Sequence, residues 1–413
     1  MALVIFIVTF LGVALIRLPW VKLDRPAAAF LGAVAMVLFG VLTPVEAVSA
    51  IDWDTLALLL GMMIIIAGLR QDGYTQAVAA AVLGRAKSPR QLLALVIIFT
   101  GVASAFLVND AVVLVLTPIL IAYCKARELN PAPFLLAEAM ASNIGGVATI
   151  TGNPQNMLIG LQSGISYVGF LVRLLPMALL SSAVLLVLTS WIYRKDLRQP
   201  FRVEGVEPYQ GLQPLNRVKP SGIILALVVA GFLVSRWIGV EVPLIALAGA
   251  GLVLAFSRNS PRDIFGQVDW VLLLFFAALF VVIGGAVHEG LLDWAIESAP
   301  LTNDLAGVGL LHGLSLVISQ LISNVPYTVL MAPVLQPLDS DLLWLSLASS
   351  ATLAGNLTLI GAVANLIVAE RATHQGVEVT FWEFFKLGLL VTVVSLIISL
   401  LVLWGEKAVG VLA

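Results

Sequence analysis

The chain has 413 residues, of which 60% are hydrophobic and only 11% are charged, and its mean hydropathy is +1.05. An average soluble domain is about one quarter charged, so this composition excludes an ordinary water-soluble globule. It predicts an all-α polytopic membrane protein with about ten transmembrane helices, at about 20 apolar residues for each crossing. The net charge of -2 gives no indication of nucleic-acid binding. Cys124 is the only cysteine, which excludes an intrachain disulfide and argues against a thiolate metal site.

Apolar runs follow one another along the whole chain, at 2–16, 27–42, 53–69, 91–108, 111–123, 133–159, 167–193, 221–238, 243–256, 270–287, 307–322, 326–335, 342–368 and 381–404. The first run has no basic start and no small-residue cleavage site, so we expect a retained first span and not a signal peptide. The run 111–123 would reach only about 20 Å across a hydrocarbon core about 30 Å thick, and 326–335 would reach less. We therefore predict two re-entrant helical hairpins, at 91–123 and at 307–335.

The charged loops predict the sidedness of the chain. The longest polar stretch, 194–219, is rich in Lys and Arg, and the positive-inside rule places it in the cytoplasm. The basic loops at Arg17 and Arg85 are expected on the same side, and the acidic segments at Glu46 and Glu289 on the outer side. This predicts a multi-pass protein of the bacterial inner membrane type with its N-terminus outside. The crossings agree with these sides only if the two hairpins enter the membrane from opposite faces.

Hairpins of opposite orientation are typical of an inverted repeat, and the sequence itself repeats. The recurring residues keep their order along the chain, and their spacing changes only slowly. The recurring pairs are Asp52 with Asp269, Trp53 with Trp270, Gly68 with Gly285, Asn109 with Asn324, Pro118 with Pro333, Gly146 with Gly355, Thr149 with Thr358, Gly152 with Gly361 and Asn156 with Asn365. The predicted inverted-topology repeats are 1–193 and 220–413, joined by the cytoplasmic linker 194–219.

Two long apolar segments, 133–159 and 342–369, are predicted to be helices broken at the membrane midplane. Each contains a run rich in Gly, Asn and Thr, SNIGGVATITGNPQN in the first and AGNLTLIGAVAN in the second. A break leaves backbone groups that only protein, water or a ligand can satisfy, which favours a binding site there. The alternative is that the glycines only allow close helix packing. Packing does not explain the paired Asn156 and Asn365.

The hairpin tips are the second candidate element, with Asn109 and Asp110 at one tip and Ser323 and Asn324 at the other. The first-turn N–H groups of each return arm can hold an anion, and the carbonyls that end the preceding arm can coordinate a cation. An ionisable residue such as Asp110 at bilayer depth is a functional candidate that could carry a proton or neutralise a cation. Alternatively, it could cap the return arm. Glu138 approaches the first break, where a water-facing position fits as well as a coupling role.

Four motifs of the sequence resemble those of a known transporter superfamily. NDAVVLVLTP, NPAPFLLAEAMASNIGGVATITGNPQN, SNVPYTVLMAP and AGNLTLIGAVAN resemble the ion transporter superfamily, within it the arsenite/antimonite efflux permeases and the melanosomal P protein type. The chain is more distantly similar to the divalent anion/sodium symporters, which carry dicarboxylates, citrate or sulfate. The likeness covers nearly the whole chain. It implies a scaffold domain and a transport domain, a homodimer and elevator-type alternating access.

The resemblance also implies which residues form the site. The symporters' Ser-Asn-Thr tips correspond to Val108, Asn109 and Asp110 and to Ser323, Asn324 and Val325, so only the second tip keeps Ser-Asn. The breaks, the tips and the resemblance together predict as substrate-binding residues Asn109, Asp110, Asn153, Asn156, Ser323, Asn324, Thr358 and Asn365. The implied cation-coupling residues are Asn109, Asp110, Gly145, Gly146, Thr149, Ser323, Asn324, Gly355 and Asn356. An Asp beside the substrate would repel a dianion unless it were protonated or paired with a cation. The Asn-Asp tip is instead like that of the arsenite permeases.

The sequence therefore predicts a secondary active transporter of a small anion or oxyacid of the arsenite type, coupled to H⁺ or Na⁺. The alternatives are a Na⁺-coupled dicarboxylate, citrate or sulfate symporter and a Na⁺/H⁺ antiporter. We expect no catalytic residue, no structural metal and no cofactor beyond the transported ion, because zinc-protease and nucleotide-binding motifs are absent from the sequence. The expected partners are the lipid bilayer, a second copy of the chain and, for an arsenite-type protein, an ATPase subunit.

Overall fold

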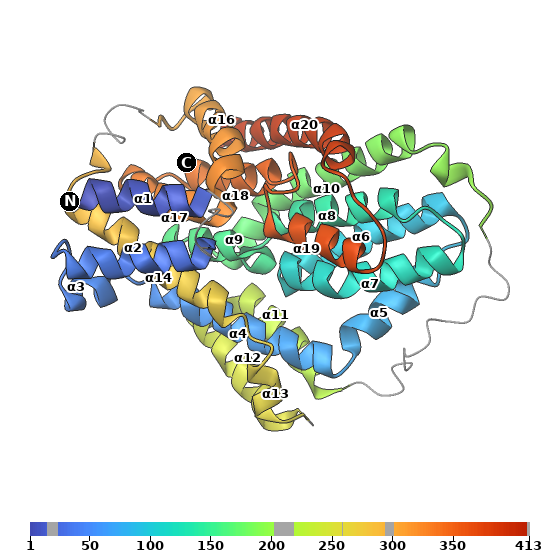
Figure 1. Ribbon diagram of the computed structural model, residues 1–413, viewed down its shortest axis with the longest axis horizontal. Coiled ribbons are helices and arrows are strands. Elements are labelled where there is room, and N and C mark those ends of the chain that lie inside the picture. Colours follow the sequence, from blue (N-terminus) through green and yellow to red (C-terminus); the bar gives the residue numbers. More distant parts are fainter. Residues whose placement is uncertain (15–23, 202–218, 258, 294–300, 411–413) are drawn as a thin grey trace.

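The computed structural model describes residues 1–14, 24–201, 219–257, 259–293 and 301–410, and within these ranges the protein contains helices and no strand. The predicted all-α class is confirmed. The α-helices, shown in Figure 1, are α1 (Ala2–Ala14), α2 (Arg25–Leu38), α3 (Pro44–Ser49), α4 (Trp53–Gln71), α5 (Tyr74–Leu83), α6 (Pro89–Leu107), α7 (Asn109–Ala126), α8 (Ala132–Gly146), α9 (Pro154–Gln162), α10 (Tyr167–Ile192), α11 (Pro220–Ile238), α12 (Val242–Phe256), α13 (Pro261–Phe265), α14 (Trp270–His288), α16 (Leu305–Ile322), α17 (Asn324–Leu335), α18 (Asp341–Ala354), α19 (Val363–His374) and α20 (Phe381–Ala408).

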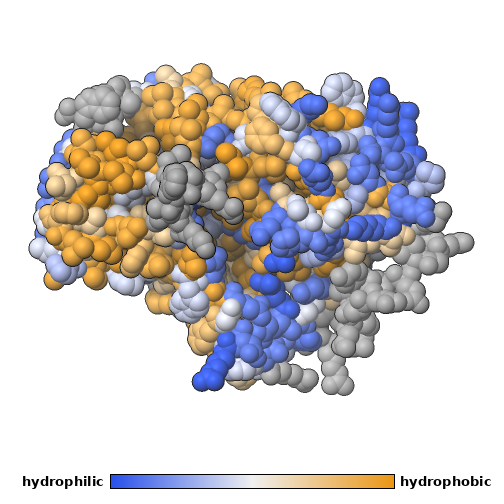
Figure 2. Space-filling model, in the orientation of Figure 1, coloured by the Kyte–Doolittle hydropathy of each residue, from blue (hydrophilic) through white to orange (hydrophobic). Residues whose placement is uncertain are grey.

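Eight of the described helices are long and apolar enough to cross a membrane, namely α4, α6, α7, α10, α11, α14, α16 and α20. Shorter apolar helices include α1, α2, α12 and α18. Large apolar side chains lie exposed along several of the long helices, for example Leu179 and Trp191 on α10. Figure 2 shows apolar residues covering much of one half of the molecule, with hydrophilic residues gathered at the opposite end. Such a surface suits a lipid environment.

The two predicted hairpins each turn on a single residue. Val108 alone separates α6 from α7, and Ser323 alone separates α16 from α17. The first return arm is longer than the apolar run predicted, because α7 continues to Ala126 and spans 18 residues. Its length alone would therefore permit a crossing, so the re-entrant path of this first hairpin stays a prediction. The second return arm, α17, has only 12 residues.

Both predicted helix breaks are present. After α8 ends at Gly146, a single 3-10 turn (Ile150–Gly152) precedes α9, which begins at Pro154. The chain from 355 to 362 likewise separates α18 from α19. Proline at the start of α9 fits a helix N-terminus, where its missing N–H is not needed.

Residues that recur in the sequence take matching structural roles. Asp52 accepts a hydrogen bond from Thr55 N at 3.0 Å and caps α4, and Asp269 caps α14 through Leu272 N at 2.9 Å. Gly68 lies against α12, since a Cβ added there would come within 2.5 Å of a side chain of α12. Gly285 lies in the same way against α2. Helix α4 thus packs on α12 while its counterpart α14 packs on α2.

Some sequence predictions fall where the structure gives no description. Residues 202–218 of the predicted linker and Arg17 lie outside the described residues. Conversely, α5 was not predicted, because Tyr74–Leu83 has too few large apolar residues to register as an apolar run. Gly73, at φ 70°, makes the turn that separates α5 from α4. This left-handed conformation favours glycine.

Candidate functional site

Four asparagines from different parts of the chain meet in one buried cluster, which we call the amide cluster: Asn109, Asn143, Asn356 and Asn365. Asn143 of α8 is its centre, because its Nδ2 donates to Asn356 Oδ1 at 2.8 Å and to Asn365 Oδ1 at 3.1 Å. Its Oδ1 accepts from Asn109 Nδ2 at 3.0 Å. All four are buried, and Asn109 has the largest exposure at 4%. The cluster therefore joins the tip of the first hairpin to both helix breaks.

The second hairpin tip lies against the second break. With its amide nitrogen turned toward the break, Asn324 donates to Ala351 O and to Gly361 O, each at 3.0 Å. The adjacent Ser323 is 5% exposed and Asn324 is 4% exposed. Each hairpin tip thus presents a buried asparagine, Asn109 or Asn324, as the first residue of its return arm.

Asn156 and Asn365 hold the breaks together. Asn156 Nδ2 donates to three carbonyls of the first break, Gly146 O at 3.0 Å, Val147 O at 3.2 Å and Thr149 O at 3.1 Å. Asn365 Nδ2 does the same in the second break, to Gly355 O at 2.7 Å and Thr358 O at 3.0 Å. These bonds satisfy backbone acceptors that the interrupted helices leave free. The paired asparagines are therefore structural supports of the breaks, and Asn365 also belongs to the amide cluster.

Replacing Asn156 with alanine should destabilise the protein. The change leaves three buried carbonyls without their shared donor, and one unpaired buried group costs about 1–3 kcal/mol. We expect a clear fall in the thermal unfolding midpoint of the purified protein in detergent. Asn130→Ala is the control, because Asn130 is exposed and its side chain bonds Asp196 at 2.9 Å. Equal midpoints for the two variants would contradict this role of Asn156.

Four further hydrogen bonds connect the breaks and the neighbouring helices. Thr352 Oγ1 of α18 accepts from Asn153 Nδ2 and from Gln155 Nε2, each at 3.2 Å. Thr358 Oγ1 donates to Gln320 Oε1 at 2.8 Å, and Gln320 Nε2 donates to a carbonyl of α18 at 2.8 Å. Asn153 and Thr358 are thus both engaged by protein groups.

The glycines of the first break allow close backbone approach. A Cβ on Gly145 would lie 2.1 Å from Gly101 O of α6, and one on Gly152 would lie 2.1 Å from Gly146 O. Close backbone packing therefore accounts for the glycines at these positions. Thr149 Oγ1 donates to the carbonyl of Ala105, near the end of the first arm. Three predicted cation-coupling residues of the first half thus have protein partners. Gly145 packs against α6, Gly146 packs against Gly152, and Thr149 forms a hydrogen bond with the first arm of the hairpin.

Both hairpin tips have unusual backbone conformations. Val108 has φ 64° and ψ 120°, and Ser323 has φ 74° and ψ 164°. Positive φ with an extended ψ is largely restricted to glycine, and such a residue costs about 1–3 kcal/mol. A β-branched residue at positive φ is rarer still. Strain of this kind at both tips, beside Asn109 and Asn324, points to a functional constraint at the hairpins.

Asp110 does not join the amide cluster. Its neighbour Asn109 faces Asn143, whereas Asp110 lines a separate cavity of about 150 Å³ with Arg70 of α4 and Asp269 of α14. Helix α7 has no side-chain cap, so the capping alternative does not explain this residue. Within the described structure, Asp110 therefore makes no hydrogen bond to the amide cluster, although it directly follows Asn109 in the chain.

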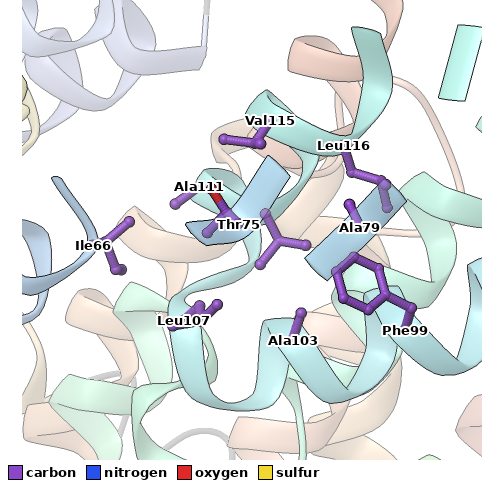
Figure 3. A pocket seen from close by; sticks show the side chains of 10 residues that line it. Ile66, Thr75, Ala79, Phe99, Ala103, Leu107, Ala111, Val115 and Leu116 are labelled. Atoms are coloured by element: carbon purple, nitrogen blue, oxygen red, sulfur yellow. The ribbon is translucent and has the colours of Figure 1, made fainter. Parts of the chain in front are cut away.

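A second, smaller pocket lies near this cavity and is almost wholly apolar. Figure 3 shows it between α5, α6 and α7, lined by Ile66, Thr75, Ala79, Phe99, Ala103, Leu107, Ala111, Val112, Val115 and Leu116. Its volume of about 20 Å³ has room for little more than one water molecule. It offers no set of polar groups to a solute. Within the described ranges, no group of three or more His, Cys, Asp or Glu side chains could hold a metal ion.

Four side chains of the site were not predicted from the sequence, namely Asn143, Gln155, Gln320 and Thr352. Asn143 and Gln155 stand inside the SNIGGVATITGNPQN run, so the motif indicated the region but not these side chains. Asn143 of the first half corresponds to Thr352 of the second half, at the same separation in sequence as the pairs Gly146/Gly355 and Asn156/Asn365. Because the two residues differ in type, they were not recognised as a recurring pair. Gln320 of the second half corresponds to Ala105 of the first half, so no recurring polar residue marked this position.

A family model and two curated relatives match this chain, and all three are named as transporters. The family model described as "Citrate transporter" matches residues 2–348. An uncharacterized transporter of Mycobacterium tuberculosis, Rv2685, is 36% identical over 371 residues, which cover 86% of this chain and 87% of the relative. The silicon efflux transporter LSI3 of Oryza sativa is 29% identical over 444 residues and covers 91% of each chain.

Among solved structures, the chain is similar to the YdaH transporter of Alcanivorax borkumensis. The TM-score is 0.60 at 18% sequence identity, and the match covers 99% of this chain and 97% of the other. At this identity the likeness concerns the fold alone.

Proposed function

The chain belongs to the citrate transporter family, and from this premise we propose that it moves a small oxyacid or monoanion across the inner membrane, coupled to H⁺ or Na⁺. It is a multi-pass membrane transporter, as its family and its eight candidate spans indicate. The observation that carries the substrate proposal is the amide cluster, in which the first tip and both breaks meet through neutral side chains.

The chemistry of the cluster favours a solute of low charge. Its described members offer amide donors and acceptors, and no Lys, Arg or His side chain hydrogen-bonds to them in the described structure. Burying an unpaired charge costs several kcal/mol, whereas a neutral oxyacid can exchange hydrogen bonds with amides directly. The name of the rice relative, a silicon efflux transporter, agrees with an oxyacid.

A citrate-type carboxylate is the second candidate. The family model is described as a citrate transporter, and Asp110 lines a cavity outside the amide cluster. A polycarboxylate would have to enter with bound cations, because the cluster itself supplies no positive side chain. Sodium/proton exchange without an anion is the third outcome to be tested.

We also propose that the two halves, 1–193 and 220–413, are inverted repeats that work as an elevator. In support, helices pair crosswise between the halves: α2 lies on α14 and α4 on α12, while α7 lies on α19 and α17 on α9. The hairpins would then gate the site from opposite sides. A homodimer, a cytoplasmic linker at 194–219 and an outside N-terminus complete the proposal, and an ATPase subunit belongs to it only for an arsenite substrate.

Flux into proteoliposomes tests the substrate and the coupling. Arsenite, silicic acid, citrate, succinate and sulfate are offered separately, under a sodium gradient and under a pH gradient. We expect uptake of a neutral oxyacid to exceed that of sulfate. Citrate uptake that needs a metal cation would establish the second candidate. Exchange of sodium for protons while none of the solutes moves would contradict the proposal.

A further inference from the structure

Glu138 is a buried carboxyl group in α8 that the proposed site does not use. Its side chain is 0% exposed. Its Oε1 accepts a hydrogen bond from Thr117 Oγ1 of α7 at 3.0 Å, and its Oε2 has no partner among the described residues. From the sequence, a water-facing position and a coupling role both fit this residue. The structure excludes the water-facing position in this conformation.

No Lys, Arg or His side chain among the described residues forms an ion pair with Glu138. The helices packed against α8 are α6, α7, α10, α18, α19 and α20. Their charged groups are Arg90, Asp110, Lys125, Arg173, Asp341, Glu370, Arg371, His374, Glu383, Lys386, Glu406 and Lys407, and none of these forms an ion pair with Glu138 in the described structure. Cys124 of α7 interacts electrostatically both with Glu138 and with Arg127, which follows the last residue of α7. An isolated buried carboxylate is strongly unfavourable, so the neutral acid is the stable form here.

Glu138 and part of the amide cluster both lie where α7 packs against α8. Two side-chain hydrogen bonds join α7 to α8 in the described structure, Asn109 to Asn143 and Thr117 to Glu138. Along α7 the order is Asn109 then Thr117, and along α8 it is the reverse, so the two helices are antiparallel. At about 1.5 Å of rise per residue, Thr117 lies about 12 Å along the arm from Asn109. A movement of α7 that frees the tip would therefore also loosen the contact at Glu138.

We propose that Glu138 is a proton-binding site that couples proton exchange to the movement of the first hairpin. While α7 lies on α8, Glu138 holds its proton in a dry environment. When α7 moves away and water enters, the O–H bond breaks, the proton passes to water and the carboxylate is hydrated. The reverse step reloads the proton before the contact closes. This inference rests on the proposed coupled transport, and it assigns the proton to a residue that touches neither hairpin tip.

The protonation of Glu138 can be measured without a substrate. The full-length protein in lipid is studied by infrared spectroscopy in neutral buffer, where a protonated carboxyl gives a C=O band distinct from that of a carboxylate. We expect the wild-type spectrum to contain a protonated-carboxyl band that Glu138→Gln removes. Glu370→Gln is the control, because Glu370 is exposed on α19, and this variant should keep the band. A band that persists unchanged in Glu138→Gln would overturn the proposal.

Transport provides the second test. In Glu138→Gln the amide keeps the size of the side chain and an acceptor for Thr117, so we expect labelled substrate still to exchange across liposomes at equal pH. A pH gradient should no longer drive accumulation, with a loss of at least tenfold, and Glu138→Asp should restore part of it. Wild-type accumulation in Glu138→Gln would overturn the proposal. If the wild type moves no solute offered, the proposed function fails while the infrared result still decides the state of Glu138.

Discussion

Replacing Asn143 with alanine should abolish transport. The change removes two hydrogen bonds donated by its Nδ2 and one accepted by its Oδ1, and it leaves Asn109, Asn356 and Asn365 without their shared partner. An unsatisfied buried polar group costs about 1–3 kcal/mol, and about 1.4 kcal/mol corresponds to a factor of ten. If two of the three groups stay unpaired, the initial rate of uptake should fall by at least about 100-fold.

The variant Asn143→Asp tests the contribution of the Nδ2 donor alone. This variant keeps the size and the oxygen that accepts from Asn109, and it loses the donor to Asn356 and Asn365. It should therefore be as inactive as the alanine variant if the donor matters. Both variants are checked for a single peak in gel filtration before flux is measured. More than half of the wild-type rate in either folded variant would show that Asn143 is not the centre of the site.

Replacing Gly145 with alanine should destabilise the fold strongly, whereas Gly101→Ala at the same helix contact should be tolerated. A Cβ on Gly145 would lie 2.1 Å from Gly101 O and 2.4 Å from Gly101 Cα, which are backbone atoms that cannot rotate away. A Cβ on Gly101 would meet its nearest atoms at 3.9 Å, an ordinary contact. Overpacking of this kind typically costs about 1–3 kcal/mol, and more where backbone must move.

The pair differs only in the direction in which the added methyl group points. Gly101→Ala also gains helix propensity worth about 1 kcal/mol, because Gly101 lies inside α6. Thermal unfolding in detergent should therefore give a midpoint for Gly101→Ala at or above that of the wild type, and a much lower one for Gly145→Ala. Equal midpoints would mean that α6 and α8 do not pack as described.

Apolar length and turn chemistry were enough to predict much of the fold. The all-α class, the helix breaks near Gly146 and Gly355 and the hairpin tips beside Asn109 and Asn324 follow from composition, from the lengths of the apolar runs and from Gly, Asn and Pro placement. The family comparisons confirm the resemblance to ion transporters that four motifs indicated. Helix α5 was missed because an alanine-rich helix that is only partly buried has no distinct apolar pattern.

The site was predicted less completely, because side-chain direction depends on packing. Asn109 and Asp110 are neighbours at one tip, and nothing in the sequence shows that the first faces the amide cluster and the second a cavity with Arg70. The burial of Glu138 depends on α7 covering α8, which is a tertiary contact. Asn156 was selected as a ligand by its polarity, whereas its amide is engaged by the carbonyls of the break.

The central claim is that two hairpins gate one buried site from opposite sides of the membrane. Single cysteines at Val108 and at Ser323, which are 8% and 5% exposed, test it in a Cys124→Ser background. A membrane-impermeant thiol reagent is applied to right-side-out and to inside-out vesicles. The account predicts that one position is labelled from the cytoplasmic side and the other from the outer side. Labelling of both positions from the same side would contradict it.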